Sequence, residues 1–441
     1  MLKKKIYFII ILIIAFSFFN IYAISNKSSS WAEEDIKKAI QYNLITENEI
    51  SNFQYSITRE KFCEIIINLY ESLTKDFDLN STDNPFIDTT NPKLIKAYNL
   101  GITNGLSAKE FGPYRYISRE EAVTILSRAI NAAKQKTYLY NENKTRPIKF
   151  WDQDNISVWA IEDIAEMEKQ GYVNGTGGGY FYPKYNISTE ESLAMAVRVF
   201  ESLSLEHKIV KTGIIHGAGE VKGFYKTNSL EAIQKSISEG GRIIEIDFNF
   251  TRDDELVCIH DWKTYYSQDI IPLSLDEFNN RRLLNRFTPM DIELLVNVLK
   301  FNPGVYIVTD IKDDNIKALT LIASRYPEII NRIIPQAYNR LEVSIIKDLG
   351  YKNIILTLYK MPYDEVIKTS NIIEFAKENS LLALTFSYEL ASENYISRLK
   401  ESNVLLLIHT ISTKEEQNMY RSLGVDGFYT DYVIFDHDDI F

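Results

Sequence analysis

The 441-residue chain is too long for one ordinary hydrophobic core, so two or more domains are expected. Hydrophobic residues make up 45% of the chain and charged residues 25%, which is the balance of a folded globular protein and excludes wholesale disorder. The formal net charge of -11 argues against nucleic acid and anionic membrane surfaces as main partners. Cys63 and Cys258 are far apart, so a disulfide framework and a cysteine-based zinc site are not expected.

Residues 1–23 have the pattern of a secretory signal peptide. Three lysines, Lys3 to Lys5, precede the apolar run Ile6 to Phe19, and Ala23 is a small residue suited to cleavage. The run is about 14 residues long, which is short for a helix that must cross roughly 30 Å of hydrocarbon. An uncleaved N-terminal anchor is the alternative, and either way the rest of the chain is expected outside the cytoplasm.

Three related helix pairs are predicted between residues 31 and 203. The phrases "SITREKF", "YISREEA" and "NISTEES" each place a hydroxyl residue (Thr58, Ser118 or Ser188) before an acidic helix start. A further helical segment precedes each phrase, and in the second and third copies it ends at Gly101 or Gly171, which suits a left-handed helix cap. A unit repeated at this spacing indicates one helix-loop-helix motif used three times.

The three copies, at about 31–76, 83–135 and 148–203, resemble the S-layer homology (SLH) module. In that family three copies form an all-α bundle with pseudo-threefold symmetry, which anchors bacterial surface proteins to a pyruvylated secondary cell-wall polysaccharide. The resemblance makes Arg59 and Arg119 candidates for wall-polymer binding, because a guanidinium can hold a carboxylate in a bidentate fork. The third copy has Thr189 at this position, which leaves its groove in doubt. The alternative is that both arginines are solvated helix-start residues.

After an expected linker at 204–211, short β-rich runs alternate with helical stretches. The runs read as strands are "GIIHG", "RIIEIDFNF", "ELVCIHDW", "VYIVTDI", "RIIPQAY", "NIILTLY", "LLALTFS", "VLLLIHT" and "GFYTDY". This alternation is typical of βα units around a parallel sheet, and residues 212–441 are enough for one TIM-type (β/α)8 barrel. The expected fold is therefore multidomain, with an α-helical bundle followed by an α/β barrel that carries a β-hairpin insertion.

Ionisable residues fall where the predicted barrel strands end. His216 ends the first strand, Glu245 and Asp247 lie in the second, and Asp310 and Lys312 end the "VYIVTDIK" run. Since loops at the carboxyl ends of barrel strands form the active face, this placement favours a functional site over accidental interruptions of a core.

The run "EIDFNFTRDDELVCIHDW" predicts an antiparallel hairpin, because four residues are too few for a parallel crossover. With Asp253-Asp254 as the turn, or with Arg252 to Glu255 looped out, Asp247 is expected opposite His260, and Glu245 shares their face. The other face is then apolar, with Ile246, Phe248 and Phe250 packed against Val257 and Ile259.

Three carboxylates, Glu245, Asp247 and Asp310, form an all-oxygen donor set suited to Ca²⁺ or Mg²⁺. Such an ion could bind a phosphoryl oxygen, and Lys312 would add a positive charge for the phosphate. His216 and His260 then remain as a general acid and a general base. Together these residue types predict metal-dependent cleavage of a phosphodiester.

The ordered motifs "IIHGAG", "TNSLEA", "EID", "HDW", "TDIK" and "GVDGFYTDY" resemble the glycerophosphodiester phosphodiesterase family, within the superfamily of barrels like phosphatidylinositol-specific phospholipase C. The resemblance spans about residues 212–432 and implies the same site: His216 and His260 as the acid-base pair, the three carboxylates as metal ligands and Lys312 on the phosphate. Two departures stand out, because the family usually has Arg where this chain has Gly217 and Glu where it has Asp310. Sphingomyelinase D enzymes share the barrel and the "D-x-K" variant.

The expected protein is thus a secreted, wall-anchored bacterial phosphodiesterase. Its substrate could be a glycerophosphodiester, a phospholipid head group or a teichoic-type polymer. The alternatives are a sphingomyelinase D-like enzyme and a surface protein whose barrel has lost catalysis and only binds or displays. His409 is expected to be a packing residue and Asp431 a barrel-closing contact.

Overall fold

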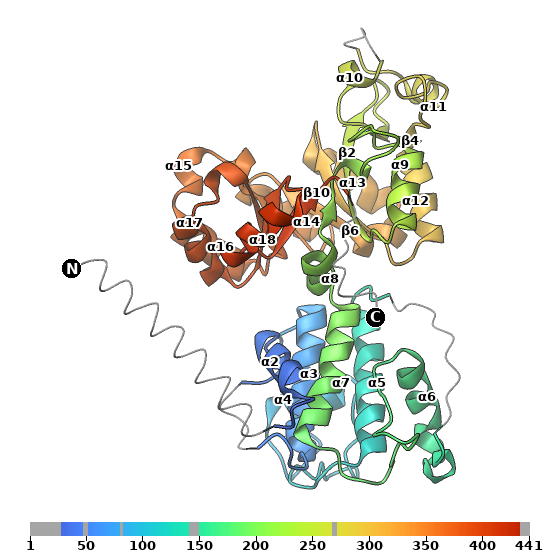
Figure 1. The fold of residues 1–441 in the computed structure, drawn as a ribbon, viewed down its shortest axis with the longest axis vertical. Helices are drawn as coiled ribbons and strands as arrows, with labels where there is room; N and C mark the ends of the chain where they lie inside the picture. The colour runs from blue at the N-terminus through green and yellow to red at the C-terminus, as the bar shows by residue number, and fades with distance from the viewer. Residues whose placement is uncertain (1–27, 47–51, 80–82, 141–149, 267–270, 433–441) are drawn as a thin grey trace, which may run out of the picture. The chain divides into compact units, whose positions relative to one another are not determined.

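The computed structural model describes residues 28–46, 52–79, 83–140, 150–266 and 271–432 (Figure 1). The chain divides into two compact units, Met1–Ser204 and Leu205–Phe441, each with its own hydrophobic core. The expected signal peptide at 1–23 lies outside the described residues. Within the described ranges, no helix has both the length and the hydropathy needed to cross a bilayer.

The first unit is a bundle of long and short helices. Its described α-helices are α2 (Glu33–Gln41), α3 (Arg59–Thr74), α4 (Pro92–Asn99), α5 (Arg119–Lys136), α6 (Ile161–Lys169) and α7 (Thr189–Leu203). The long helices α3, α5 and α7 stand side by side (Figure 1), and each short helix packs on a long helix of another copy: α2 on α7, α4 on α3 and α6 on α5. This cyclic packing confirms the expected all-α bundle of three copies.

Backbone hydrogen bonds close the same ring at the starts of the long helices. The amide of Arg59 donates to Arg115 O at 2.8 Å, and the amide of Arg119 donates to Tyr185 O at 2.9 Å. The amide of Thr189 completes the cycle by donating to Tyr55 O at 3.0 Å. Each copy is therefore tied to the next by an equivalent bond, which gives the bundle its pseudo-threefold symmetry.

The hydroxyl residues expected at the helix starts are N-caps. Ser118 and Ser188 form capping boxes with Glu121 and Glu191, and Thr58 accepts a hydrogen bond from the amide of Lys61. These bonds satisfy amides that have no partner in the first helical turn. The spacing of hydroxyl and acidic residues therefore located these helix starts correctly.

The second unit is a closed barrel of eight parallel strands. These are β1 (Ile214–Ile215), β2 (Ile243–Phe250), β5 (Tyr306–Ile311), β6 (Ile333–Ala337), β7 (Ile355–Thr357), β8 (Ala383–Ser387), β9 (Leu405–His409) and β10 (Gly427–Thr430). They pair in the order β1-β10-β9-β8-β7-β6-β5-β2, and β1 also pairs with β2, which closes the sheet. Each of them falls within one of the runs expected to be strands, so the (β/α)8 barrel is confirmed.

Helices connect the strands around the barrel (Figure 1). They are α9 (Leu230–Ser238), α12 (Ile292–Phe301), α13 (Asn315–Arg325), α14 (Arg340–Asp348), α15 (Tyr363–Val366), α16 (Thr369–Glu378), α17 (Glu393–Leu399) and α18 (Lys414–Ser422). Between β2 and α12 the chain inserts β3 (Leu256–Cys258), α10 (Trp262–Tyr266), α11 (Leu275–Asn279) and β4 (Met290–Asp291). The strands β3 and β4 extend the edge of β2 in antiparallel pairs, as expected for a hairpin insertion.

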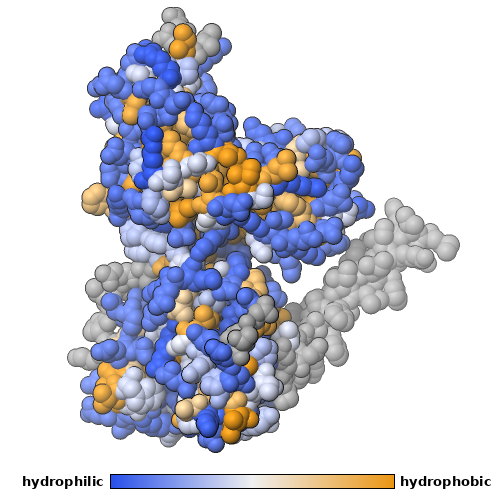
Figure 2. Space-filling model, turned by 180° about the vertical axis from the view of Figure 1, so that it is seen from behind, coloured by the Kyte–Doolittle hydropathy of each residue, from blue (hydrophilic) through white to orange (hydrophobic). Residues whose placement is uncertain are grey.

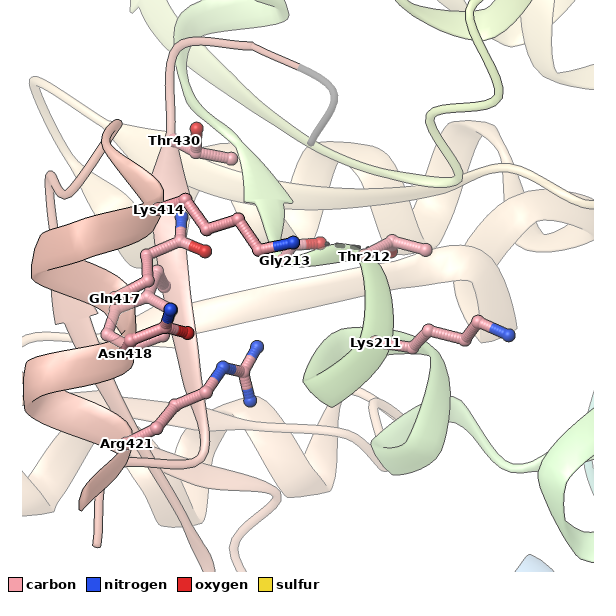
Figure 3. Close-up of a pocket in the computed structure, with 9 residues that line it drawn as sticks. Lys211, Thr212, Gly213, Lys414, Gln417, Asn418, Arg421 and Thr430 are labelled. Carbon is pink, nitrogen blue, oxygen red and sulfur yellow. Dashed lines mark hydrogen bonds between the residues drawn. The ribbon is translucent and has the colours of Figure 1, made fainter. Parts of the chain in front are cut away.

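The segment expected as a linker, 204–211, is largely helical. Helix α8 spans Leu205–Thr212 and leads into β1, and its Ile209 is fully buried. Arg421 of α18 donates hydrogen bonds to Val210 O at 2.9 Å and to Asp426 O at 3.1 Å. Figure 3 shows Arg421 reaching from α18 into the pocket beside α8. Residues 205–212 therefore belong to the barrel unit.

The expected register of the hairpin is wrong by one residue. Phe248 pairs with Cys258 and Phe250 with Leu256, so five residues form the loop. Thr251 closes it, since its amide donates to Glu255 O at 2.9 Å and its hydroxyl accepts from the Glu255 amide at 2.9 Å.

This register changes which residues share a face of the hairpin. Leu256 and Cys258, in place of Val257 and Ile259, accompany Phe248 on one face, and β3 ends before His260. Burial could not select the register, because Leu256, Val257 and Cys258 are all fully buried. The expected pairing of Asp247 with His260 is therefore absent.

The surface of the barrel unit is mostly hydrophilic. Figure 2 shows a band of hydrophobic surface among the charged and polar side chains of this unit. Large hydrophobic residues with exposed side chains in the unit include Phe301, Leu341, Tyr363 and Tyr388. Single exposed hydrophobic side chains such as these are common on folded domains.

Candidate active site

The carboxylates of the candidate site come from two neighbouring parallel strands. β2 and β5 are paired so that Asp247 lies beside Asp310, near the carboxyl ends of both strands. Glu245 is two residues earlier on β2 and therefore points to the same side. All three are buried, with exposures of 2% for Glu245, 0% for Asp247 and 5% for Asp310.

The three carboxylates converge closely enough to hold one cation. One oxygen from each of Glu245, Asp247 and Asp310 lies within 4.8 Å of the others. Asp247 Oδ1 is buried and faces the Lys312 ammonium at 2.8 Å, and a carboxylate oxygen with one such neighbour can still accept a cation. A buried all-oxygen donor set with no sulfur or imidazole fits a hard divalent cation such as Ca²⁺ or Mg²⁺.

The pKa of Glu245 also fits a cation-binding site. Burial, joined by the Asp247 and Asp310 carboxylates, raises the pKa of Glu245 to about 8, although the His216 ring acts in the opposite direction. Crowded carboxylates must share a proton or bind a cation, because like charges in a buried site repel. A divalent ion would replace that proton at neutral pH.

Lys312 follows β5 and bridges two of the carboxylates. Its ammonium lies 2.6 Å from Asp310 Oδ2 and 2.8 Å from Asp247 Oδ1. Burial disfavours both charges, but the ion pair outweighs it, which lowers the pKa of Asp310 and raises the pKa of Lys312. Tyr338 donates a further hydrogen bond to Asp310 Oδ1 at 2.8 Å. Lys312 is therefore fixed at the edge of the carboxylate cluster.

His216 lies directly after β1, on the other side of Glu245. Its Nδ1 is 3.1 Å from Asp431 Oδ1, and its Nε2 is 3.8 Å from Glu245 Oε2. An ionised carboxylate only accepts, so Nδ1 is the nitrogen that donates to Asp431, and Nε2 faces the cluster. Burial opposes the charged ring, yet Glu245 and Asp431 outweigh burial and raise the pKa of His216.

Asp431 thus orients the His216 ring. Ser412 supports it from both sides, because the Ser412 hydroxyl donates to Asp431 Oδ2 at 3.3 Å and accepts from the Asp431 amide at 3.1 Å. Asp431 was expected only as a barrel-closing contact. The pairing of β10 with β1 that closes the barrel also brings Asp431 next to His216.

His260 lies outside this group of contacting residues. It lies two residues beyond β3, its side chain is 40% exposed, and its Nδ1 pairs with Asp261 Oδ2 at 2.9 Å. In the described ranges, no hydrogen bond or ion pair joins His260 to His216 or to the three carboxylates. Its exposure leaves the ring accessible to a substrate.

Asn228 holds Asp247 in place and was not recognised from the sequence as a site residue. Its side-chain amide donates to Asp247 Oδ2 at 2.8 Å, and its carbonyl oxygen accepts from the Asp247 amide at 3.0 Å. Both residues are fully buried. From the sequence, "TNS" indicated only the start of a helix. The contact between Asn228 and Asp247 joins residues 19 positions apart, which no local pattern reveals.

Replacing Asn228 by alanine is expected to destabilise the barrel by about 3 kcal/mol, because two buried groups of Asp247 lose their partners. Urea unfolding of the full chain would measure this loss. Asn249→Ala is the matched control on the same strand as Asp247, since Asn249 bonds only the adjacent Phe250 amide and is half-buried. Equal midpoints for the two variants would contradict this role.

His409 ends β9 and lies close to the site. Its ring packs against Tyr359 at a tilt of 51°, with 4.2 Å between centroids, and its Nδ1 is 3.5 Å from Thr385 Oγ1. Burial and the nearby His216 charge lower the pKa of His409 to about 4. A neutral, packed imidazole agrees with the expected packing role.

In the helical unit, Arg59 and Arg119 occupy equivalent places between copies. Arg59 donates to Thr103 Oγ1 at 2.7 Å and lies over the Phe111 ring. Arg119 pairs with Glu191 at 2.9 Å and lies over the Phe181 ring. Both side chains are buried, with exposures of 6% and 7%, so neither is a solvated helix-start residue.

Arg119 lines a groove with a cavity volume of about 540 Å³. Trp31 and Arg198 line the same groove. A groove of about 470 Å³ at an equivalent junction contains Trp159 and Glu121, and Glu121 is 4.0 Å from Arg59. Each of these two grooves therefore combines an exposed tryptophan with a glutamate that faces a buried arginine, and Arg119 itself lines its groove.

The third junction differs in both charged positions. Thr189 replaces the arginine and bonds Tyr55 O through its amide and hydroxyl. Lys61 stands where Ser118 and Ser188 have their capping glutamates, and it lines a groove with Lys93. This junction therefore has neither the arginine nor the glutamate found at the corresponding positions of the other two.

The fold and the site together define a class of protein: a (β/α)8 barrel with an acidic, histidine-flanked site at its strand ends, joined to a helical repeat bundle. The family model described as the glycerophosphoryl diester phosphodiesterase family matches residues 221–434. The model of the S-layer homology domain matches residues 92–123 and 149–191. The chain therefore joins segments that match the S-layer homology domain to a barrel that matches the glycerophosphoryl diester phosphodiesterase family.

Curated relatives share only part of this chain. An endoglucanase of Bacillus sp. (strain KSM-635) is 28% identical over 173 residues, which is 38% of this chain and 17% of the relative. An amylopullulanase of Thermoanaerobacterium thermosulfurigenes is 27% identical over 176 residues, which is 39% of this chain and 9% of the relative. The chain thus spans a small fraction of the length of these relatives.

Solved structures similar to this chain include a putative glycerophosphoryl diester phosphodiesterase from Silicibacter pomeroyi, with a TM-score of 0.42, 14% identity and coverage of 50% of this chain and 89% of that one. Another is a phosphodiesterase from Oleispira antarctica in complex with the product sn-glycerol-3-phosphate. It has a TM-score of 0.40, 16% identity and coverage of 50% and 92%.

Proposed function

We propose that the barrel hydrolyses phosphodiesters of the glycerophosphodiester type, and that the helical bundle holds it on the bacterial cell wall. The convergence of three buried carboxylates within 4.8 Å, next to a histidine oriented by Asp431, is the observation that carries the proposal. The match of the barrel to a phosphodiesterase family supports the same reaction.

In this proposal His216 and His260 exchange protons with the attacking and leaving oxygens. His216 presents Nε2 toward the site while Asp431 holds Nδ1, which fixes the tautomer. Lys312 binds a phosphoryl oxygen from the β5 side. Glu245, Asp247 and Asp310 hold Ca²⁺ or Mg²⁺, which supplies positive charge to offset the negative charge that develops on the phosphoryl oxygens. Phosphorus is attacked either by water or by a neighbouring hydroxyl of the substrate.

The test is turnover of glycerophosphocholine, with release of glycerol phosphate or choline, by the full chain in the presence of Ca²⁺ or Mg²⁺. Both His216→Ala and His260→Ala are expected to abolish it. A folded protein that cleaves no phosphodiester with either ion would reject the enzyme and favour a barrel that only binds or displays. Release of choline from sphingomyelin or lysophosphatidylcholine, with the phosphate retained on the lipid, by a protein that leaves glycerophosphocholine intact would identify sphingomyelinase D-type cleavage.

The proposed wall anchor uses the grooves between the helical copies. Arg59 and Arg119 are proposed to shape the two grooves that carry the Arg–Glu pair, and Trp31 and Trp159 offer exposed rings in them. The partner would be an acidic secondary cell-wall polysaccharide, with the chain secreted to the cell surface. Cleavage of the proposed signal peptide would precede anchoring.

Replacing Trp31 and Trp159 together by alanine is expected to reduce retention of the full chain on purified wall sacculi about tenfold. Their side chains are about half exposed, at 54% and 53%, so stability should change little. Trp151→Ala is the matched control, because Trp151 is 75% exposed and is absent from the lining of both grooves. Co-sedimentation with sacculi measures the effect, and equal retention of all variants would contradict it.

A further inference from the structure

Lys226, in the loop between β1 and α9, packs against Gly217, the residue that follows His216. A β-carbon placed on Gly217 would lie 2.7 Å from Lys226 Cα, 2.9 Å from its Cβ and 3.0 Å from its Cγ. The stem of Lys226 therefore fills the space that a side chain at position 217 would need. Position 217 and Lys226 cannot both present a long side chain at this place.

The backbone at Lys226 is held in an uncommon conformation. Lys226 and Asn228 have φ values of 55° and 50°, which place two non-glycine residues in the left-handed region. Lys226 O accepts hydrogen bonds from Tyr265 OH and from Asn228 Nδ2, and Asn228 also fixes Asp247. Unfavourable backbone conformations persist where the surrounding structure enforces them, and they cluster at functional sites.

The charge of Lys226 reaches the histidine side of the site. Burial raises the pKa of Asp431 and the Lys226 ammonium acts against it, whereas burial lowers the pKa of His409 and the ammonium adds to that effect. Lys226 is half-buried, and within the described ranges it has no carboxylate at ion-pair distance. Lys312, in contrast, is already paired with two carboxylates.

We propose that the Lys226 ammonium binds a non-bridging phosphate oxygen of the substrate on the His216 side of the site. This inference rests on the proposed function, because it assigns a second phosphate contact to the same reaction. Lys312 would hold the phosphate from the β5 side and Lys226 from the β1 side. The charge next to His216 would thus come from the following loop. A glycine at position 217, whose φ is 54°, leaves the space that the Lys226 stem occupies.

Lys226→Met tests the proposal, because it keeps most of the stem and removes the charge. Isothermal titration with inorganic phosphate, in the presence of Mg²⁺, should show affinity about tenfold weaker than in the wild type. KM for glycerophosphocholine should rise about tenfold with a smaller change in kcat. Lys226→Arg should retain phosphate binding within a few-fold.

Lys222→Met is the matched control. Lys222 lies in the same loop, has φ of 51° and is exposed, so it shares the local backbone and the charge but does not approach Gly217. Its phosphate affinity and KM should equal those of the wild type. Melting curves of all variants confirm folding, and Lys226→Gln serves in place of Lys226→Met if the latter does not fold.

Equal phosphate affinity in the wild type and Lys226→Met, or no phosphate binding by the wild type, would overturn the assignment of Lys226 whatever the turnover assay gives. An equal loss of affinity in Lys222→Met would overturn it too, since any charge in the loop would then suffice. If the wild type binds phosphate through Lys226 but cleaves no phosphodiester, the proposed function fails and the phosphate site stands.

Discussion

Replacing His216 by alanine is expected to lower kcat for phosphodiester cleavage about a thousandfold, within the range that a general acid or base contributes. The His216 ring faces the carboxylate cluster, and a further carboxylate outside the cluster orients it. Its Nδ1 lies 3.1 Å from Asp431 Oδ1. Steady-state assays with glycerophosphocholine would measure the loss. KM should change less, because the ring acts on protons more than on the phosphate charge.

Two further variants separate catalysis from folding. Asp431→Asn keeps the shape of the side chain but can donate to Nδ1, which favours the wrong tautomer, so an intermediate loss of tens of fold is expected. His207→Ala removes a histidine from α8, outside the strand ends, and should leave kcat unchanged. A kcat in His216→Ala above a tenth of the wild-type value, with unchanged melting, would be incompatible with the assigned role.

Removing divalent cations with a chelator is expected to abolish turnover, and adding back Ca²⁺ or Mg²⁺ should restore it. The same ions should raise the Tm of the full chain, because ligands that bind only the folded state stabilise it, by about 2.7 kcal/mol at one hundred times Kd. The reason is the cluster of Glu245, Asp247 and Asp310, whose mutual repulsion a cation relieves. Differential scanning calorimetry and the turnover assay would report the two effects independently.

Asp247→Asn should remove most of the thermal stabilisation by the ion, since it takes one charge from the centre of the cluster. Asp254→Asn makes the same chemical change on the adjacent hairpin, where the side chain is 74% exposed and pairs with Lys317. Asparagine also tolerates the left-handed backbone there, with φ of 62°. A cation-induced rise in Tm that survives Asp247→Asn but not Asp254→Asn would place the ion elsewhere.

The barrel could be predicted from the sequence because its strands leave a local signal. Strands such as β5 and β8 are short apolar runs, and the residues that interrupt them fall where they end. The helix starts at Ser118 and Ser188 were equally local, since a capping box involves residues three apart. The carboxylate cluster followed from the same rule, because parallel neighbours end on the same side.

The parts of the site that could not be predicted depend on contacts between residues that are far apart in the sequence. Asp431 contacts His216 across 215 residues of chain, and no local pattern marks such a pair. No local pattern singled out Asn228 or Lys226 as site residues, and only the folded loop brings them to Asp247 and Gly217. The hairpin register failed because its strand is covered on both faces, which removes the alternation that normally selects one register.

Because the three helical copies pack in a cycle, the unit that is repeated in the sequence is not the unit that folds. Since α2 packs on α7, the first and last copies must meet across more than a hundred residues before either is covered. A single copy released by proteolysis would expose the apolar sides of both its helices. Chain growth past Leu203 is therefore required before the first and third copies are complete, and deletion of either of them should prevent the other two from folding.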